Sequence, residues 1–237
     1  MKGFLVSSGT ELLLGQTVNT NAAFLGRELA RLGIDLHLVV TVGDNLNRLA
    51  NAIRQGAEEA DLVIVSGGLG PTEDDISREA LAQALGVPLE HHPVAQEVTS
   101  RFFQRRGLPL PTVNERQFLA PKGSKIMDNP YGTAPGVYYE FNDKIFVLLP
   151  GPPRELNPMF YNELLPLLKG KSKGMVIHSK VLKVAGIGEP AAEGLIKDLI
   201  HSSNPTVAPT AKRGEIHFRI TAKAEGVEEA KELDRKS

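Results

Sequence analysis

The first half of the chain alternates short apolar runs with segments of helical periodicity. The apolar runs are at 5–8, 35–42 and 61–65, and β-branched residues are frequent in them. Between these runs, apolar residues recur every three or four positions over 21–32 and 46–60, which predicts amphipathic helices. This strand and helix order predicts a mostly parallel sheet with right-handed crossovers and helices on both faces. The pattern therefore predicts an α/β fold.

The pattern continues with two more helices, a hairpin and a closing helix. The turn signal Asn142-Asp143 lies between two β-rich runs, which predicts a hairpin that we place at the edge of the sheet. The further predicted elements are a helix from about Asp75 to Gly86, a helix over 94–106, hairpin strands over 137–141 and 144–149, and a helix from Pro153 to about Leu168.

A basic, glycine-containing stretch at 169–174 separates two patterned regions, as domain linkers do. We therefore predict one domain over 1–168 and a second, small α+β domain over 169–237. The elements predicted in the second domain are a strand over 176–184, a helix over 190–202, strands over 206–209 and 216–222, and a helix over 226–235.

Composition removes several classes of protein. Of the 237 residues, 41% are hydrophobic and 23% are charged, and the net charge is −1, so the chain is neither disordered nor globally attracted to nucleic acids or anionic membranes. The absence of cysteine excludes disulfides, thiolate metal sites and cysteine nucleophiles. No apolar run is long enough to span a membrane, and the first residues form a strand pattern. We expect a cytoplasmic protein without a membrane partner.

A glycine-rich segment follows the strand predicted at 61–65. Ser66, Gly67, Gly68 and Gly70 lie between this strand and the next helix, where ligands of open α/β sheets bind. Glycines allow close backbone approach, and a helix start offers free N–H groups to a phosphate. The segment matches neither the dinucleotide fingerprint nor a P-loop. Phosphate binding and a tight turn that merely packs both fit it.

Carboxylates and hydroxyls accompany this loop. Thr72 precedes Asp74 and Asp75, and two adjacent carboxylates beside a phosphate can hold Mg²⁺. Because Asp is also favoured at helix starts, capping is the alternative for Asp74 and Asp75.

The predicted strands at 5–8 and 35–42 also end in polar loops. Gly9, Thr10 and Glu11 follow the first strand, and Asp44 follows the second. Since parallel strands end at one edge, these loops predict a shared site.

Four further residues are candidate ligand contacts. Asn19 and Asn21 either touch a ligand or cap the first helix. Thr133 belongs to a rigid Pro/Gly loop that flanks the hairpin. Arg154 begins a helix, where the dipole opposes a cation, so it either contacts a ligand anion or forms an ion pair with Glu155 or another carboxylate.

Taken in order, these loops resemble the competence- and damage-inducible CinA family, which is similar to the molybdopterin-binding domains of molybdenum-cofactor biosynthesis proteins. The matching segments are 8–16 with 18–21, 41–45, 67–72 with Asp74-Asp75, 129–136, and 150–153 with Glu155. Residues 183–224, which include Gly186-Ile187-Gly188-Glu189, resemble the family's KH-like domain.

The resemblance implies a three-layer α/β/α molybdopterin-binding-like domain, a KH-like domain and a homodimer. The implied activity is a non-Nudix pyrophosphatase that converts ADP-ribose to AMP and ribose 5-phosphate with Mg²⁺, Co²⁺ or Mn²⁺, and with K⁺ as a possible further cofactor. The alternative is a molybdopterin- or nucleotide-binding module without hydrolytic activity. The family's carboxy-terminal deamidase domain is not expected in this sequence, which ends within the KH-like domain's last helix. A nucleic-acid partner is not expected, because the Gly-x-x-Gly loop of KH modules is missing.

Under this interpretation the site residues fall into three groups. The catalytic candidates are Asp74, Asp75 and Glu11. The metal candidates are Asp44, Asp74 and Asp75. The ligand-binding candidates are Gly9, Thr10, Asn19, Asn21, Ser66, Gly67, Gly68, Gly70, Thr72, Thr133, Gly136 and Arg154.

Overall fold

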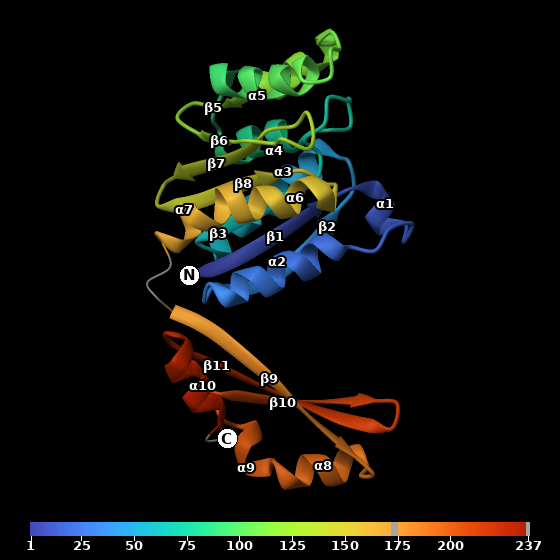
Figure 1. The fold of residues 1–237 in the computed structure, drawn as a ribbon, viewed down its shortest axis with the longest axis vertical. Helices are drawn as coiled ribbons and strands as arrows, with labels where there is room; N and C mark the ends of the chain where they lie inside the picture. The colour runs from blue at the N-terminus through green and yellow to red at the C-terminus, as the bar shows by residue number, and fades with distance from the viewer. Residues whose placement is uncertain (172–174, 236–237) are drawn as a thin grey trace. The chain divides into compact units, whose positions relative to one another are not determined.

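The computed structural model describes residues 1–171 and 175–235, and these form two compact units. The first unit comprises residues 1–27 and 35–171, and the second comprises residues 28–34 and the described residues after Lys171. Part of the predicted linker, residues 172–174, lies outside the described residues. Figure 1 shows the elements of both units.

The first unit is built on a six-stranded sheet with the order β2-β1-β3-β8-β7-β6. The strands are β1 (Lys2–Ser8), β2 (Asp35–Val42), β3 (Leu62–Ser66), β6 (Lys125–Met127), β7 (Gly136–Phe141) and β8 (Lys144–Leu149). The four strands β2, β1, β3 and β8 are parallel, whereas β7 and β6 run antiparallel to their neighbours. The mostly parallel sheet confirms the predicted fold class.

The helices of the first unit lie between the strands along the chain (Figure 1). They are α1 (Thr10–Leu13), α2 (Thr20–Arg31), α3 (Leu46–Glu59), α4 (Ser77–Leu85), α5 (Pro93–Gln104), the 3₁₀ helix η1 (Thr112–Phe118), α6 (Pro153–Met159), the π-helical turn η2 (Phe160–Leu164) and α7 (Leu165–Lys169). The end of α2, residues 28–31, is grouped with the second unit. A separate two-stranded sheet pairs β4 (Leu89–His91) with β5 (Leu119–Pro121).

The sheet is buried on both faces. Phe4 and Val6 of β1 pack in one cluster with Leu49 and Ile53 of α3. Leu5, which lies between Phe4 and Val6 in the strand, points to the opposite face and is also fully buried. Helices α2 and α6 lie over that face (Figure 1). The resulting layers of helix, sheet and helix are those predicted.

The register of the parallel strands aligns their carboxyl ends. Ser7 of β1 lies opposite Thr41 of β2 and Ser66 of β3, and Ser66 lies opposite Leu149 of β8. The loops that follow these four strands therefore leave the sheet at one edge.

Three predicted elements differ from the structure of the first unit. Helix α4 begins at Ser77 rather than Asp75, so Asp74 and Asp75 belong to the loop that precedes it. The hairpin turns at Asn142 and Asp143, both with positive φ, but it is internal, because β6 pairs with β7 and forms the edge. Helix α5 begins at Pro93 and ends at Gln104.

The second unit has a three-stranded antiparallel sheet of order β10-β11-β9. Its elements are β9 (Met175–Ala185), α8 (Glu189–Leu195), α9 (Lys197–Ile200), β10 (Thr206–Lys212), β11 (Glu215–Glu225) and α10 (Val227–Arg235). The helix predicted over 190–202 is therefore two short helices interrupted at Ile196. Phe218 and Ile220 of β11 pack with Ala192 of α8 in the core of this unit.

Within residues 1–171 and 175–235, no helix is both long enough and apolar enough to cross a lipid bilayer.

Candidate functional site

Hydrogen bonds join the loops that leave the carboxyl edge of the sheet. Gly9 N–H donates to Val42 O over 3.0 Å, which ties the loop after β1 to the end of β2. Gly67 N–H donates to Leu149 O over 2.9 Å and ties the glycine loop to the end of β8. Asn21 Nδ2 donates to the carbonyl oxygen of Gly151 over 2.7 Å. The loops after β1, β2, β3 and β8 thus form one connected rim.

The carbonyl oxygens of Gly67, Gly68 and Leu69, three successive residues of the glycine loop, all accept hydrogen bonds from other residues of the protein. Ser77 Oγ donates to Gly67 O over 2.7 Å, and Ser77 N–H donates to Gly68 O over 3.1 Å. Leu69 O accepts hydrogen bonds from Arg78 Nη1 at 3.1 Å and from the amide of Gln117 at 3.0 Å.

The N–H groups of the same three peptides belong to Gly68, Leu69 and Gly70. In a trans peptide the N–H points away from the C=O, so these N–H groups are turned away from the partners of the carbonyls. Within the described residues they have no hydrogen-bond partner. Successive free N–H groups of this kind form a concave anion-binding surface.

The backbone conformation of the glycine loop requires glycine at positions 67 and 68. Gly67 and Gly68 have φ values of +100° and +67°, which favour glycine because L side chains rarely adopt them. A Cβ on Gly67 would also overlap the carbonyl oxygen of Ser8. The loop can therefore pass close to the end of β1 only without a side chain.

Two hollows lie at this rim, and Gly151 lines both of them. The first has a volume of about 120 Å³ and lies between the end of β1, the start of α2 and the loop that precedes α6. The second has a volume of about 270 Å³ and lies beside the glycine loop. We name them the β1 hollow and the glycine-loop hollow.

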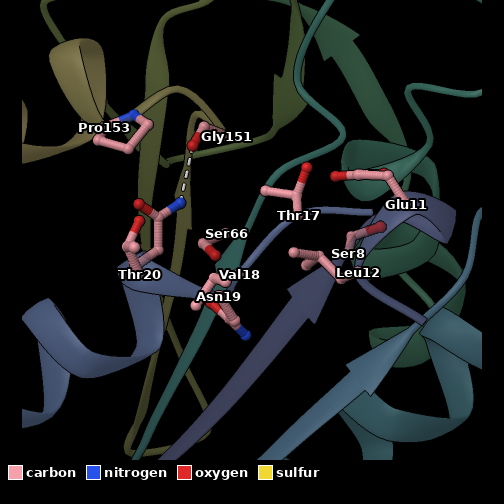
Figure 2. Close-up of a pocket in the computed structure, with 11 residues that line it drawn as sticks. Ser8, Glu11, Leu12, Thr17, Val18, Asn19, Thr20, Ser66, Gly151 and Pro153 are labelled. Carbon is pink, nitrogen blue, oxygen red and sulfur yellow. Dashed lines mark hydrogen bonds between the residues drawn. The ribbon is translucent and has the colours of Figure 1, made fainter. Parts of the chain in front are cut away.

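The β1 hollow contains polar atoms without partners. Ser8 Oγ and Asn21 Oδ1 are buried and have no hydrogen-bond partner among the residues that the structure describes. Figure 2 shows Ser8, Ser66 and Thr17 around the hollow, with Asn19 and Gly151 on its sides and a dashed line for the hydrogen bond to the Gly151 carbonyl. Because buried polar groups are normally paired, this hollow is suited to a ligand with hydroxyl or amine groups.

The glycine-loop hollow has a carboxylate on each of two walls. Its lining includes Asp75 on one loop and Glu155 at the start of α6. Glu155 is only 7% exposed, and its Oε2 accepts a hydrogen bond from Asn129 Nδ2 over 2.9 Å. Asn129 Nδ2 also donates to Ala134 O over 2.8 Å. The Glu155 side chain is therefore fixed in place by the 129–134 loop.

Asp74 and Asp75 converge on one hydroxyl. Thr72 Oγ1 lies 2.5 Å from Asp74 Oδ1 and 2.6 Å from Asp75 Oδ2. The hydroxyl has one proton, so it donates to one carboxylate at a time. The hydrogen bonds from Thr72 and from its own backbone N–H hold the pKa of Asp74 below its usual value. Asp74 is therefore ionised at neutral pH.

The predicted metal set of Asp44, Asp74 and Asp75 is not assembled as a cluster. Across 1–171 and 175–235, no three His, Cys, Asp or Glu side chains are grouped to hold a metal ion by themselves. The reason for Asp44 is local: its Oδ2 accepts from Thr10 N–H at 3.0 Å, and its N–H donates to Thr10 Oγ1 at 3.1 Å. The pair Asp74 and Asp75 remains suitable for Mg²⁺, which needs one or two carboxylates together with phosphate and water oxygens.

The other predicted site residues are divided between the two hollows and the packing around them. Glu11, Asn19, Asn21 and Ser66 line the β1 hollow. The glycine-loop hollow is lined by Gly68, Gly70 and Thr133. Asn19 also caps α2, because its Oδ1 accepts a hydrogen bond from Ala22 N–H at 3.0 Å.

Three predicted residues have surroundings that do not point to a ligand. Arg154 is exposed and lies 3.9 Å from the Glu155 carboxylate, measured from Nε to Oε1. Gly136 is buried in β7, where a Cβ would meet the sulfur of Met159. Gly9 is covered by the carboxylate of Glu11, which a Cβ would overlap.

Sequence reasoning missed several side chains that build the site. Glu155 was considered as a partner for Arg154 and as part of a family-like segment but was not predicted as a site residue, although its position in the first turn of a helix after a parallel strand is a usable signal. Arg78 and Gln117 bind the glycine loop from α4 and η1. No local signal identifies Gln117, because it is 48 residues from the carbonyl that it contacts.

Two family models match successive parts of this chain. Residues 4–170 match the model described as a probable molybdopterin binding domain, and residues 179–236 match the damage-inducible protein CinA KH domain. A putative competence-damage inducible protein of Moorella thermoacetica is 55% identical over 234 residues, which are 98% of this chain and 56% of that protein. A CinA-like protein of Dictyoglomus turgidum is 47% identical over 98% of this chain and 57% of its own length. This chain spans little more than half the length of these relatives.

Solved structures show the same fold. A protein CinA of unknown function from Thermoplasma acidophilum matches with a TM-score of 0.66 and 32% identity, over 70% of this chain and 99% of that one. A molybdopterin biosynthesis protein from Mycobacterium abscessus matches with a TM-score of 0.50 and 20% identity, over 73% of this chain and 94% of that one, and shows the fold alone. With a molybdopterin-binding-like domain followed by a CinA-type KH domain, this chain belongs to the CinA family.

Proposed function

We propose that this chain is a divalent-metal-dependent pyrophosphatase that hydrolyses ADP-ribose to AMP and ribose 5-phosphate. The observation that carries the proposal is the free N–H groups of Gly68, Leu69 and Gly70 beside a hollow with carboxylates on two walls. Backbone N–H groups bind phosphate oxygens. Carboxylates would repel a diphosphate unless a cation lay between them, so the two features together suit a metal diphosphate.

Each part of the ligand has a complementary part of the site. The diphosphate binds the glycine loop, and Asp74 and Asp75 hold the cation, which is Mg²⁺, Co²⁺ or Mn²⁺. Ser8 Oγ and Asn21 Oδ1 are free to bind ribose or adenine groups in the β1 hollow. The two hollows meet at Gly151, which suits a dinucleotide that extends across both.

The reaction is the attack of water on one phosphorus. A bond forms between the water oxygen and that phosphorus, the bond to the bridging oxygen breaks, and its electron pair leaves with the second phosphate. Glu155 is fixed by Asn129 at the wall of the hollow, and we assign it to orient the water and accept its proton. A bound divalent cation supplies neutralisation of the charge that develops on the phosphate.

The test is chromatographic detection of AMP after incubation of the purified protein with ADP-ribose. Parallel incubations contain FAD, NADH or coenzyme A, each with Mg²⁺, Mn²⁺ or Co²⁺ and with or without K⁺. AMP from ADP-ribose that disappears with a chelator supports the proposal. No product from any dinucleotide with any metal contradicts it.

Variants make the test specific to the site. The double substitution of Asp74→Asn with Asp75→Asn is expected to abolish turnover and to leave the thermal midpoint nearly unchanged. Glu58→Gln, on the exposed side of α3, serves as the control and is expected to keep full activity. A fully active double variant would exclude the assignment of this pair.

A second candidate function is molybdopterin binding without hydrolysis. It is favoured by the match of residues 4–170 to a probable molybdopterin binding domain. Pterin fluorescence that copurifies with the protein, together with no binding of ADP-ribose, would support this function. Homodimer formation also remains a prediction, which sedimentation of the purified chain tests.

A further inference from the structure

A buried arginine lies directly behind the glycine loop. Arg78, near the start of α4, is 2% exposed. Its Nη1 donates to Leu69 O over 3.1 Å, and its Nη2 donates to Pro135 O over 3.4 Å. Leu69 belongs to the glycine loop, and Pro135 follows Thr133 and Ala134, which also line the hollow. One guanidinium group thus connects two walls of the glycine-loop hollow.

The guanidinium of Arg78 is charged but has no ion-pair partner. Burial lowers its pKa to about 10, so it is a cation at neutral pH. Within the described residues, no carboxylate forms a salt bridge with it, and its Nε has no hydrogen-bond partner. A buried cation without a paired anion is costly, by several kcal/mol for desolvation in an ordinary protein interior.

The nearby acidic groups already have other partners. Glu79 and Asp75 act on Arg78 through space. However, Glu79 Oε1 binds Arg116 Nη2 at 2.9 Å, and Asp75 Oδ2 accepts from Thr72 N–H at 3.0 Å. Arg116 adds a second positive charge at the same loop, since its Nη1 donates to Thr72 O over 2.6 Å. The second oxygen of Glu79, Oε2, is buried and has no hydrogen-bond partner within the described residues. Glu79 and Asp75 therefore oppose the charge of Arg78 only through space and not by direct contact.

The peptide that Arg78 holds is also a wall of the hollow. Leu69 and Gly70 both line it, and the N–H of Gly70 points away from the carbonyl that Arg78 and Gln117 bind. Donation to a carbonyl polarises its peptide and makes the N–H of the same peptide a stronger donor. An anion at the Gly70 N–H would therefore experience both this N–H and the charge behind it.

We propose that Arg78 is the fixed counter-charge for a diphosphate bound on the glycine loop. This inference rests on the proposed function, because it assumes that the loop binds phosphate groups. Arg78 acts through the peptide between Leu69 and Gly70 without touching the ligand, so it is a positioning residue. Arg78 contributes a positive charge with which no carboxylate of the described residues forms a direct ion pair.

The experiment is calorimetric binding of inorganic pyrophosphate to the whole chain in the presence of Mg²⁺ and without ADP-ribose. Arg78→Gln keeps an amide donor but removes the charge, and we expect it to weaken binding by more than about tenfold, which is about 1.4 kcal/mol. Arg78→Lys keeps the charge and loses the guanidinium fork, and we expect affinity within about threefold of the native chain. Arg101→Gln removes a charge from α5 and is the matched control, with unchanged affinity expected.

Comparison of Arg78→Gln with Arg78→Lys distinguishes the effect of the positive charge on binding from the effect of the guanidinium geometry. Equal losses in Arg78→Gln and Arg78→Lys would overturn the proposal, because the fork geometry alone would then matter. Native affinity in Arg78→Gln would also overturn it. If Arg78→Gln does not fold, Arg78→Lys decides alone, since a loss greater than about tenfold contradicts the proposal. Binding of pyrophosphate is measured without turnover of ADP-ribose, so a failure to hydrolyse ADP-ribose leaves this result intact.

Discussion

Asn21 and Gly151 are 130 residues apart in the sequence, and the side-chain amide of Asn21 donates a hydrogen bond to the Gly151 carbonyl oxygen over 2.7 Å. This bond joins the start of α2 to the loop between β8 and α6. Gly151 lines both hollows, and the Oδ1 of Asn21 is buried without a partner in the described part of the chain. Asn21 therefore holds the rim between the hollows and keeps one acceptor free for a ligand.

Asn21→Asp should weaken diphosphate binding strongly. A carboxylate cannot donate to the Gly151 carbonyl, so the residue that lines both hollows loses its support, and it adds negative charge to the neighbouring β1 hollow. We expect the dissociation constant for pyrophosphate to rise more than about tenfold, which is about 1.4 kcal/mol, when measured by calorimetry. Asn51→Asp makes the same charge change on the exposed side of α3 and should leave affinity unchanged. Equal affinities of the two variants would remove Asn21 from the site.

Gly67→Ala should destabilise the first unit more than Gly86→Ala. Both glycines have positive φ, so each substitution carries backbone strain of about 1–2 kcal/mol. A Cβ on Gly67 also overlaps the Ser8 carbonyl, whereas nothing lies within 4 Å of a Cβ on Gly86. We expect urea unfolding to show a loss in the free energy of unfolding about 1–3 kcal/mol larger for Gly67→Ala. Similar losses would mean that the glycine loop can shift away from β1.

Glu155→Gln should separate catalysis from folding. Glutamine has nearly the same shape and can still accept the hydrogen bond from Asn129, so the thermal midpoint should change little. If Glu155 orients the water, the rate constant kcat for ADP-ribose should fall by about 10²–10⁴-fold, with a smaller change in KM. The rate of AMP release measures this. An unchanged kcat would mean that Glu155 does not orient the water and that another carboxylate does.

Asp234→Asn should destabilise the second unit, and the loss relative to the native chain should be larger at neutral pH than in acid. Burial alone would raise the pKa of Asp234, but hydrogen bonds from Lys180 at 3.1 Å and His178 at 2.5 Å outweigh it and lower the pKa. A lowered native pKa contributes stability above the unfolded pKa of Asp, and this stability is lost as the pH falls through the native value. We expect a loss of about 1–3 kcal/mol at neutral pH.

Amide hydrogen exchange of β9 measures this loss, since β9 carries both His178 and Lys180. Glu229→Gln, an exposed substitution on the same helix, is the control. A difference between native chain and Asp234→Asn that does not shrink in acid would contradict the assigned role of Asp234.

Local pattern was sufficient for most elements of the fold. The predicted helix over 46–60 is α3 (Leu46–Glu59), and the predicted turn at Asn142 and Asp143 is present with both residues at positive φ. These features depend on residues close in sequence, through helical periodicity and turn chemistry. The helix predicted over 190–202 was wrong in its continuity, because the only breaker near the interruption at Ile196 is the single Gly194, which a helix tolerates at a cost of about 1 kcal/mol.

Elements with few residues escaped prediction. Strand β6 has three residues, too few for a period to be visible, and its pairing with β7 moved the hairpin from the edge into the sheet. Similarly, the start of α4 was placed at Asp75, because an Asp is typical of a helix start. In the structure the side chain of Asp75 accepts from Thr72 instead, and the helix begins at Ser77.

The sequence by itself determined the α/β class, the glycine loop and the acidic residues near it, because glycine content, periodicity and neighbouring carboxylates are local properties. Tertiary structure alone decided which of these residues face one another. Asp44 was bound by Thr10 rather than joined to Asp74 and Asp75, while Glu155 and Arg78 were brought to the hollow. The physical reason is that the register of parallel strands and the packing of α4 and α6 fix these distances, and neither is encoded in the spacing of residues along the chain.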